Sequence, residues 1–352
     1  MGSAPGMPKN FSPRGRGRAR RRAAILAGAL VVGGIVVFAL SRLDLHRIGH
    51  DLVNASPGWV ALAMLLMGLS LVLRSVSWQQ TLRAALPDTP IPWPAVIRAT
   101  MIGVMGSAVF PGRVGEPTRV LVLARRLQGP TRRLLAVIAG TVFSQTLINL
   151  LALAILAAVT FSSVSIFHGQ EGGLAGALAI PALIGALVLG GPSLLRLGRR
   201  SRVDRVRRAA SAITRLLGLA RRGLAVFTRP RNGLAAVAAQ LLAWAFQWGS
   251  CYMIVLALGL QHEATPATAA AVLLAVNVSA VLPATPSNVG VFQAACVVVL
   301  AAYGVGAGPG LAYGIILQAV EVLTALALGI PALLGEGLTW QDIRRAPVAG
   351  AE

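Results

Sequence analysis

The sequence has little charge, few aromatic residues and almost no cysteine. Only 12% of its 352 residues are charged, against about 25% in soluble domains. Hydrophobic residues make up 56%, and the mean hydropathy is +0.73, which excludes an ordinary water-soluble globular protein. Its two cysteines, Cys251 and Cys296, both lie in apolar stretches. A disulfide framework and a Cys/His metal site are therefore excluded.

Motifs of the common enzyme classes are also missing. The chain contains no GxSxG, HExxH or P-loop motif, and no GxGxxG in a Rossmann context. We therefore expect no catalytic residues, no cofactor and no metal, and interpret the protein as not being an enzyme. The best enzymatic alternative is a membrane glycosyltransferase that uses Asp44 and Asp51 in an outer loop. It is disfavoured because all outer loops are short.

The net charge of +21 is distributed unevenly. The basic residues are 31 Arg and one Lys, gathered in the N-terminal tail, in a loop at 196–231 and around a Gly/Pro-rich motif at 111–119. Because apolar stretches with few charges separate these groups, they indicate orientation in a membrane and contact with anionic lipid rather than nucleic acid. The dominance of arginine indicates a GC-rich bacterial genome, so we expect a bacterial plasma membrane.

The apolar runs predict an all-α polytopic membrane protein with about six full transmembrane helices. We expect a disordered basic tail at 1–22, a transmembrane domain at 23–340 and a second tail at 341–352. No small-x-small cleavage site follows the first apolar run, which favours an uncleaved helix over a signal peptide. The expected spans lie at 23–40, 59–76, 134–161, 174–190, 234–260 and 311–334.

Two further apolar segments are broken by proline and glycine. Residues 95–111 lead into PGRVGEPTR, and residues 266–303 are interrupted by PATPSNVG. Non-helical backbone at membrane depth is tolerated only where protein or a water-filled cavity satisfies it, so these breaks predict two re-entrant helix pairs. The breaks also resemble each other, because SAVFPGRVG in the first is matched in the second by SAVLP, a three-residue insertion and SNVG.

Charge distribution orients the expected spans. If both pairs are re-entrant and the N-terminal tail is cytoplasmic, the loop at 196–231 with its 12 Arg and the C-terminal tail are cytoplasmic too, as the positive-inside rule requires. A full crossing by 95–111 would place that loop outside. The halves at about 23–190 and 191–340, the second beginning with the basic loop 191–231, are then inverted repeats, which are typical of transporters.

The strongest cluster of candidate binding residues lies at the first break. Arg113 and Arg119 carry forked donors suited to phosphate. Glu116 can hold one arginine or serve as its counter-charge. Pro117 suits the first turn of a helix, whose free N–H groups attract anions. The alternative is an interfacial turn whose arginines contact lipid headgroups.

The second break and the last spans carry further polar residues. Ser287 or Asn288 is expected to cap a helix, and this segment is open to two interpretations, a headgroup site or a simple turn. Glu321 is unusual, because an intramembrane acid normally faces a cavity or a partner. Arg74 and Arg98 are its candidate partners, or reach the interface instead. We expect the intramembrane amides mainly to link helices: Gln145, Asn149, Gln240, Gln247, Asn277 and Gln318.

The motif PxRxGExxR, followed about 170 residues later by LPxxPxxxGVF, resembles the lysylphosphatidylglycerol synthase transmembrane region, also called the flippase-like family. The resemblance covers about residues 20–340. It implies a membrane region that moves lipids between leaflets. It also implies headgroup contact by Arg113, Glu116 and Arg119, and a second gate at Pro286, Gly290 and Phe292.

Two departures from the family pattern stand out. The second motif usually reads GVFE, where this chain has Gln293, and the last span often carries an arginine near Gln318. If these groups pair in relatives, this chain has replaced two charges by amides, which would keep a hydrogen bond and alter the substrate or weaken activity. Only about a dozen residues follow Trp340, so we expect no aminoacyl-transferase domain and no lysyl transfer.

The sequence therefore predicts non-enzymatic translocation of an anionic phospholipid or a polyprenyl-phosphate-linked sugar. Transport is expected to be passive or driven by an ion gradient, because no ATP site is found. The alternative is a membrane scaffold that presents lipid to a glycosyltransferase or a lipid-modifying enzyme. The candidate binding residues are Arg113, Glu116, Arg119, Pro286, Asn288, Gly290, Phe292, Gln293 and Glu321.

Overall fold

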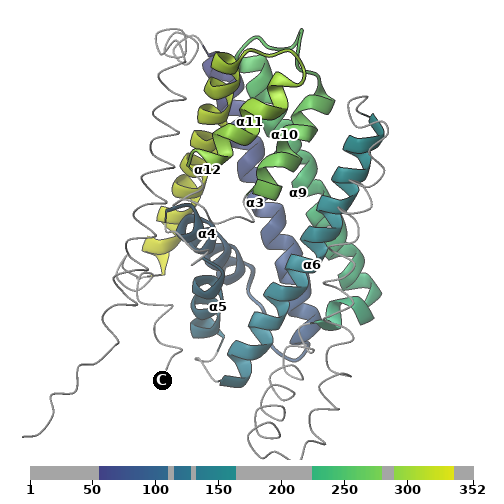
Figure 1. The fold of residues 1–352 in the computed structure, drawn as a ribbon. Helices are drawn as coiled ribbons and strands as arrows, with labels where there is room; N and C mark the ends of the chain where they lie inside the picture. The colour runs from purple at the N-terminus through teal and green to yellow at the C-terminus, as the bar shows by residue number, and fades with distance from the viewer. Residues whose placement is uncertain (1–54, 110–114, 128–131, 164–223, 280–288, 337–352) are drawn as a thin grey trace, which may run out of the picture. The chain divides into compact units, whose positions relative to one another are not determined.

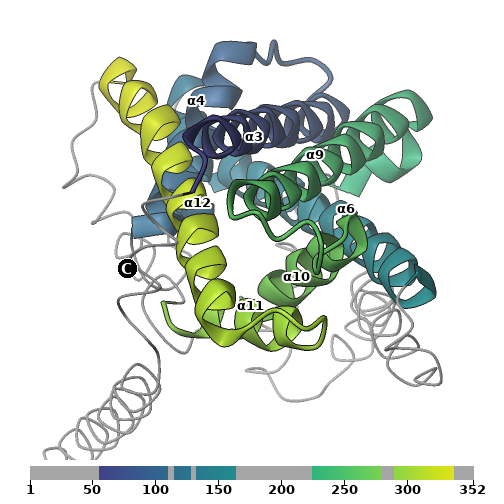
Figure 2. The same cartoon turned by 90° about the horizontal axis from the view of Figure 1, so that it is seen from above.

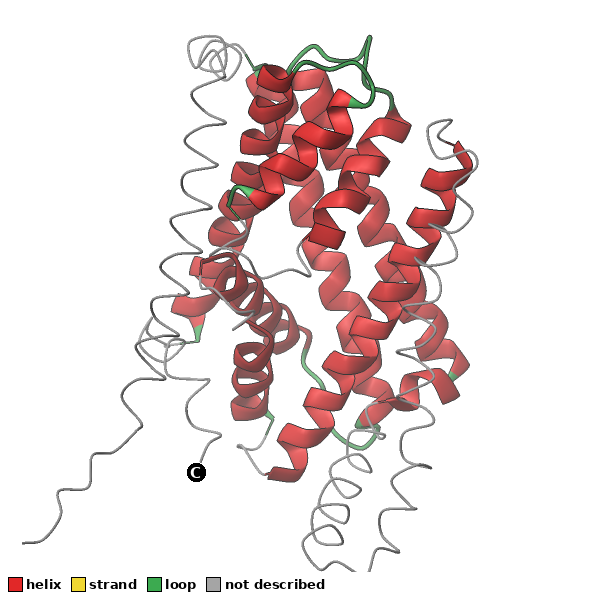
Figure 3. Cartoon of the chain, in the orientation of Figure 1, coloured by secondary structure: helices red, strands yellow, loops and turns green. Residues whose placement is uncertain are grey.

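The computed structural model describes residues 55–109, 115–127, 132–163, 224–279 and 289–336. All of these belong to one structural unit, Ile48–Glu352. Regular structure within them is helical throughout (Figure 3). The expected spans at 23–40 and 174–190 and both tails lie outside the described residues. The helices are α3 (Pro57–Ala85), α4 (Trp93–Val109), α5 (Gly115–Arg126), α6 (Arg132–Ser163), the short 3-10 helix η2 (Leu224–Thr228), α9 (Pro230–Ala257), α10 (Pro266–Ser279), α11 (Val291–Ala301) and α12 (Ala307–Gly335).

Four of the described helices are long and apolar enough to cross a bilayer. Proline stands in the first turn of α3 and of α9, where its missing N–H costs no intrahelical hydrogen bond. The prediction of a helical membrane protein with several spans is confirmed for these segments. The spans are Pro57–Ala85, Leu134–Ala158, Pro230–Ala257 and Ala307–Gly335.

Helices α3 and α9 pack side by side along their length and run antiparallel (Figure 2). At one end, the Ser56 N–H donates to the Ala257 carbonyl oxygen at 2.9 Å. Further along, Ser250 Oγ donates to the Ala63 carbonyl oxygen at 2.9 Å. At the other end, Asn232 Nδ2 of α9 donates to the Gln80 carbonyl oxygen of α3 at 3.4 Å. Because hydrogen bonds join the two helices near both ends, polar side chains facing this pair have a defined position.

Two pairs of shorter helices flank the two sequence breaks. In the first pair, α4 and α5 approach so closely that a Cβ on Gly115 would overlap the Gly103 carbonyl oxygen and Ser107 Oγ. Glycine at position 115 is therefore needed for this packing. The second pair is α10 and α11. The glycines of the two aligned VG dipeptides, Gly115 and Gly290, both lie where the second helix of a pair begins.

Helix α12 contacts both pairs, one near each of its ends (Figure 1). Near its start, Gly314 lies against Gln293 of α11, where an added Cβ would sit 3.1 Å from the Gln293 Cα. Near its end, Gly329 lies against Met105 of α4. The α10–α11 pair and the α4–α5 pair are thus packed at opposite ends of a single bilayer-length helix.

Candidate functional site

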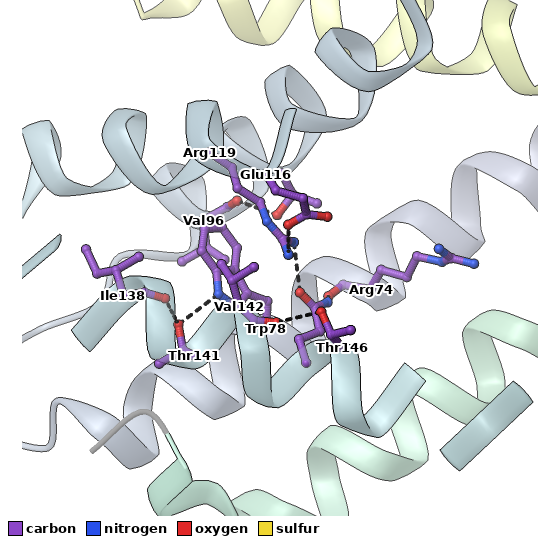
Figure 4. Close-up of polar contacts among 11 residues, drawn as sticks. Arg74, Trp78, Val96, Glu116, Arg119, Ile138, Thr141, Val142 and Thr146 are labelled. Atoms are coloured by element: carbon purple, nitrogen blue, oxygen red, sulfur yellow. Dashed lines mark hydrogen bonds and ion pairs between the residues drawn. The ribbon is translucent and has the colours of Figure 1, made fainter. Parts of the chain in front are cut away.

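Arg119 of α5 is buried, with 8% of its surface exposed. Its Nη2 forms an ion pair with Glu116, one turn earlier on α5, at 2.5 Å. Its Nη1 donates to Gln145 Oε1 of α6 at 2.8 Å. The guanidinium carbon lies 4.8 Å from the centre of the Trp78 ring, within the range of a cation–π interaction. Figure 4 shows these side chains together.

Trp78 is held in place beneath this arginine. Its Nε1 donates to Thr141 Oγ1 at 3.1 Å, and Thr141 Oγ1 donates to the Ile138 carbonyl oxygen at 2.7 Å. The indole is fully buried, so its orientation is fixed by packing as well as by hydrogen bonding. The cation–π face that Arg119 uses is therefore preformed.

Gln145 connects this group to a second arginine. Its Nε2 donates to the backbone carbonyl oxygen of Arg74 on α3 at 2.8 Å, while its Oε1 accepts from Arg119. The Arg74 Nη2 donates to Gln247 Oε1 of α9, and the Arg74 guanidinium carbon lies 5.9 Å from the centre of the Trp244 ring. The Arg74 side chain therefore contacts α9, instead of extending only towards the membrane–water interface.

Glu321 of α12 completes the cluster. It lies close enough to Gln247 and Arg74 to interact with them electrostatically. No direct ion pair joins Glu321 to Arg74 within the described residues, so the prediction that Arg74 is its partner stays a prediction. Arg98, the other candidate partner, pairs instead with Glu336 at 3.5 Å.

We call these six residues the charged network: Arg74, Glu116, Arg119, Gln145, Gln247 and Glu321. It contains two arginines and two glutamates, so its formal charges cancel. Removing the Glu116 carboxylate would leave the buried Arg119 guanidinium without its counter-charge, which is destabilising. The network joins α3, α5, α6, α9 and α12, which are far apart in sequence.

The second break has a different chemistry. The Gly290 N–H donates to Gln293 Oε1 at 2.7 Å, and Gly290 is the N-cap of α11 with φ of 88°, a conformation that favours glycine. The expectation of a cap at Ser287 or Asn288 was therefore wrong. Gln293 Nε2 in turn donates to Gln318 Oε1 of α12.

The family comparison matches residues 25–329 to the lysylphosphatidylglycerol synthase TM region. The chain belongs to this family. A comparison with curated proteins found no match. In this family member, Gln293 and Gln318, the positions at which the resemblance implied opposite charges in relatives, are hydrogen-bonded to each other as amides.

The remaining candidate residues divide between the core and the segments that are not described. Phe292 lies in the apolar cluster that also contains Tyr313 and Leu317. Arg113, Pro286 and Asn288 lie outside the described residues. No group of three or more metal-ligating side chains occurs in the described ranges, and the absence of a cofactor stays a prediction.

Most of the intramembrane amides link different helices, as expected. Gln240 Nε2 donates to Asn149 Oδ1 at 2.8 Å, and Gln145, Gln247 and Gln318 make the contacts described above. Asn277 differs, because its Nδ2 donates to the Leu273 carbonyl oxygen within its own helix at 2.8 Å.

Sequence reasoning missed Glu336, which follows the last residue of α12. It accepts from Arg126 Nε at 2.7 Å and pairs with Arg98, and its side chain is 5% exposed. Its hydrogen bond raises the pKa of Arg126. The signal was an acid directly after an apolar span. This ion-pair group fastens both helices of the first pair to the end of α12.

Proposed function

We propose that the protein moves a lipid with a phosphate-bearing, anionic headgroup between the leaflets of a bacterial plasma membrane. The substrate class is an anionic phospholipid or a polyprenyl-phosphate-linked sugar. The observation that supports this most is the charged network, which places two arginines among bilayer-length helices. Such residues are costly in a membrane and mark pathways for charged substrates.

Arg119 is the proposed capture residue. Its guanidinium is oriented by Gln145 and Trp78, and its counter-charge Glu116 is 50% exposed along the side chain. A headgroup phosphate can therefore take the place of the Glu116 carboxylate without leaving Arg119 unpaired. Guanidinium donors match phosphate oxygens in geometry, and Arg113 belongs to the same proposed site.

We propose that the two helix pairs are re-entrant from opposite faces of the membrane and belong to inverted halves. Their packing at opposite ends of α12 and the matching place of the VG dipeptides support this. Gly290, Phe292 and Gln293, together with Pro286 and Asn288, form the proposed gate at the second break. Both termini are then cytoplasmic, with the Arg-rich loop on the same side.

The proposed transport is non-enzymatic, with the acyl or prenyl tails remaining in the bilayer while the headgroup crosses. A glycosyltransferase or lipid-modifying enzyme would supply or consume the lipid. A scaffold that only presents lipid to such an enzyme is the competing function, and the experiment below separates the two.

The test compares wild type with Arg119→Gln and, as a matched control, Arg125→Gln. Arg125 lies on the same helix but is exposed. Native mass spectrometry should find one class of phosphate lipid retained by wild type and Arg125→Gln and lost from Arg119→Gln. In vesicles, the first two should move that lipid and the third should not. Unselective lipid profiles in all three would overturn the site, and retention without movement would favour the scaffold.

A further inference from the structure

We infer that Arg74, Gln247 and Glu321 form a second station for the same lipid phosphate, reached after Arg119. This inference rests on the proposed function and adds to it a residue, Arg74, that the motif analysis did not place in the site. The ligand chemistry is a phosphate monoester or diester on a lipid, from either a glycerophospholipid or a polyprenyl phosphate.

The two arginines have equivalent surroundings. Arg119 is bound by one glutamate, one glutamine and one tryptophan ring: Glu116, Gln145 and Trp78. Arg74 has the same three kinds of neighbour, with its glutamate nearby instead of in direct ion-pair contact: Glu321, Gln247 and Trp244. The kinds of residue that surround Arg119, the proposed capture residue, are thus repeated around Arg74.

Each arginine also has one buried N–H donor that makes no hydrogen bond within the described residues. The Nε atoms of Arg74 and Arg119 are both buried, and neither has a hydrogen-bond partner within the described part of the chain. A buried donor without a partner is costly and requires an explanation. A phosphate oxygen is an acceptor that would satisfy it.

The position of Arg74 relative to the two helix pairs also supports a second station at this residue. Gln145 joins the two stations directly, because it accepts from the Arg119 side chain and donates to the Arg74 backbone. On α12, Glu321 lies one turn after Gln318, which contacts the second helix pair through Gln293. Arg74 is therefore joined to the first break by hydrogen bonds and lies near Glu321, which is one turn from the residue that contacts the second pair.

The arrangement keeps charge balanced while phosphate occupies Arg119, because Glu116 is displaced towards solvent and Arg74 keeps Glu321 as its neighbouring counter-charge. When phosphate moves to Arg74, Glu116 returns to Arg119. A headgroup leaving Arg119 thus finds a second cation instead of an apolar interior, where an unpaired ion is strongly disfavoured.

The experiment reconstitutes the full chain into vesicles that carry a fluorescent lipid, with dithionite quenching to follow its movement. One set carries labelled phosphatidylglycerol and the other a labelled polyprenyl-phosphate sugar, which separates the two sources. The variants are Arg74→Gln, Arg74→Gln/Glu321→Gln and Arg74→Lys, with Arg125→Gln as control. The double variant removes both charges and so avoids an unpaired buried ion.

We expect both Arg74→Gln variants to lower the flux about tenfold to hundredfold, as for the loss of a charge-assisted hydrogen bond. Lipid retention at Arg119, measured by native mass spectrometry, should persist in both. Arg74→Lys keeps the charge and should retain most of the flux. Wild-type flux in the folded double variant would overturn the second station while leaving Arg119 in place. Failure of wild type to move either probe would overturn the proposed function and this inference with it.

Discussion

Replacement of Gly115 by alanine tests whether the first helix pair must be closely packed to position Arg119. The added Cβ would overlap the carbonyl oxygen of Gly103 and Ser107 Oγ. Since the first obstacle is backbone, it cannot move aside as a flexible side chain would, and α4 and α5 must separate. Overpacking of this kind costs about 1–3 kcal/mol, and we expect the upper end.

A helical glycine replaced by alanine also gains up to about 1 kcal/mol from reduced chain entropy. The expected net loss for Gly115→Ala is therefore about 2 kcal/mol. Gly68→Ala in α3 is the matched control, because its Cβ would meet Thr324 and Leu328 side chains at 3.8 Å, an ordinary contact. That variant should gain up to about 1 kcal/mol, so the two variants should differ by about 3 kcal/mol.

The free energy of unfolding can be measured in mixed micelles of a mild detergent and sodium dodecyl sulfate, followed by tryptophan fluorescence. Arg119 lies one turn after Gly115, so lipid retention should fall in Gly115→Ala and not in Gly68→Ala. Equal unfolding free energies for the two variants, to within about 0.5 kcal/mol, would show that the close approach of α4 and α5 is not needed and would refute this reasoning.

Three further predictions test other parts of the structure. Gln293→Glu or Gln318→Arg alone should destabilise the protein by up to about 3 kcal/mol, because each leaves a partly buried charge unpaired, and the double variant should recover most of this in a double-mutant cycle. Trp78→Phe should cost about 1–3 kcal/mol of unfolding free energy, since it removes a buried hydrogen bond and weakens a cation–π contact; an unchanged value would argue against both. A cysteine at exposed position Asp88 should react with a membrane-impermeant maleimide only from the cytoplasmic side, and one at His262 only from outside. The native cysteines are buried and give little background, so labelling of both sites from one side would refute the topology.

The described spans could be predicted because a bilayer-length apolar run is read directly from sequence. Their ends were less accurate. The expected span at 59–76 stops near Arg74, whereas α3 continues to Ala85. The polar residues of this extension include Gln79 and Thr81, which are buried. Both donate to backbone carbonyl oxygens, so they are satisfied by protein rather than exposed to lipid, and a hydropathy window cannot tell these two environments apart.

The site was only partly visible for a related reason. Glu116 and Arg119 are three residues apart on one helix, a spacing that places them on the same face, so their ion pair follows from the sequence. Glu321 was recognised as unusual, but its partner depends on how α3 and α12 pack. Arg74 and Arg98 were equivalent candidates until the fold separated them, joining Arg74 to Gln247 and Arg98 to Glu336.

The charged network is better explained by function than by stability. Replacing a buried ion pair with apolar residues of similar volume is often neutral or stabilising, so folding alone gives no reason to keep two arginines and two glutamates among apolar helices. The second break shows that the fold does not require charge at every helix contact, because Gln293 and Gln318 join α11 to α12 as neutral amides. Charge is retained around Arg74 and Arg119, where each guanidinium still has a donor to offer. A pathway for phosphate needs such donors, whereas a structural contact would be satisfied by amides.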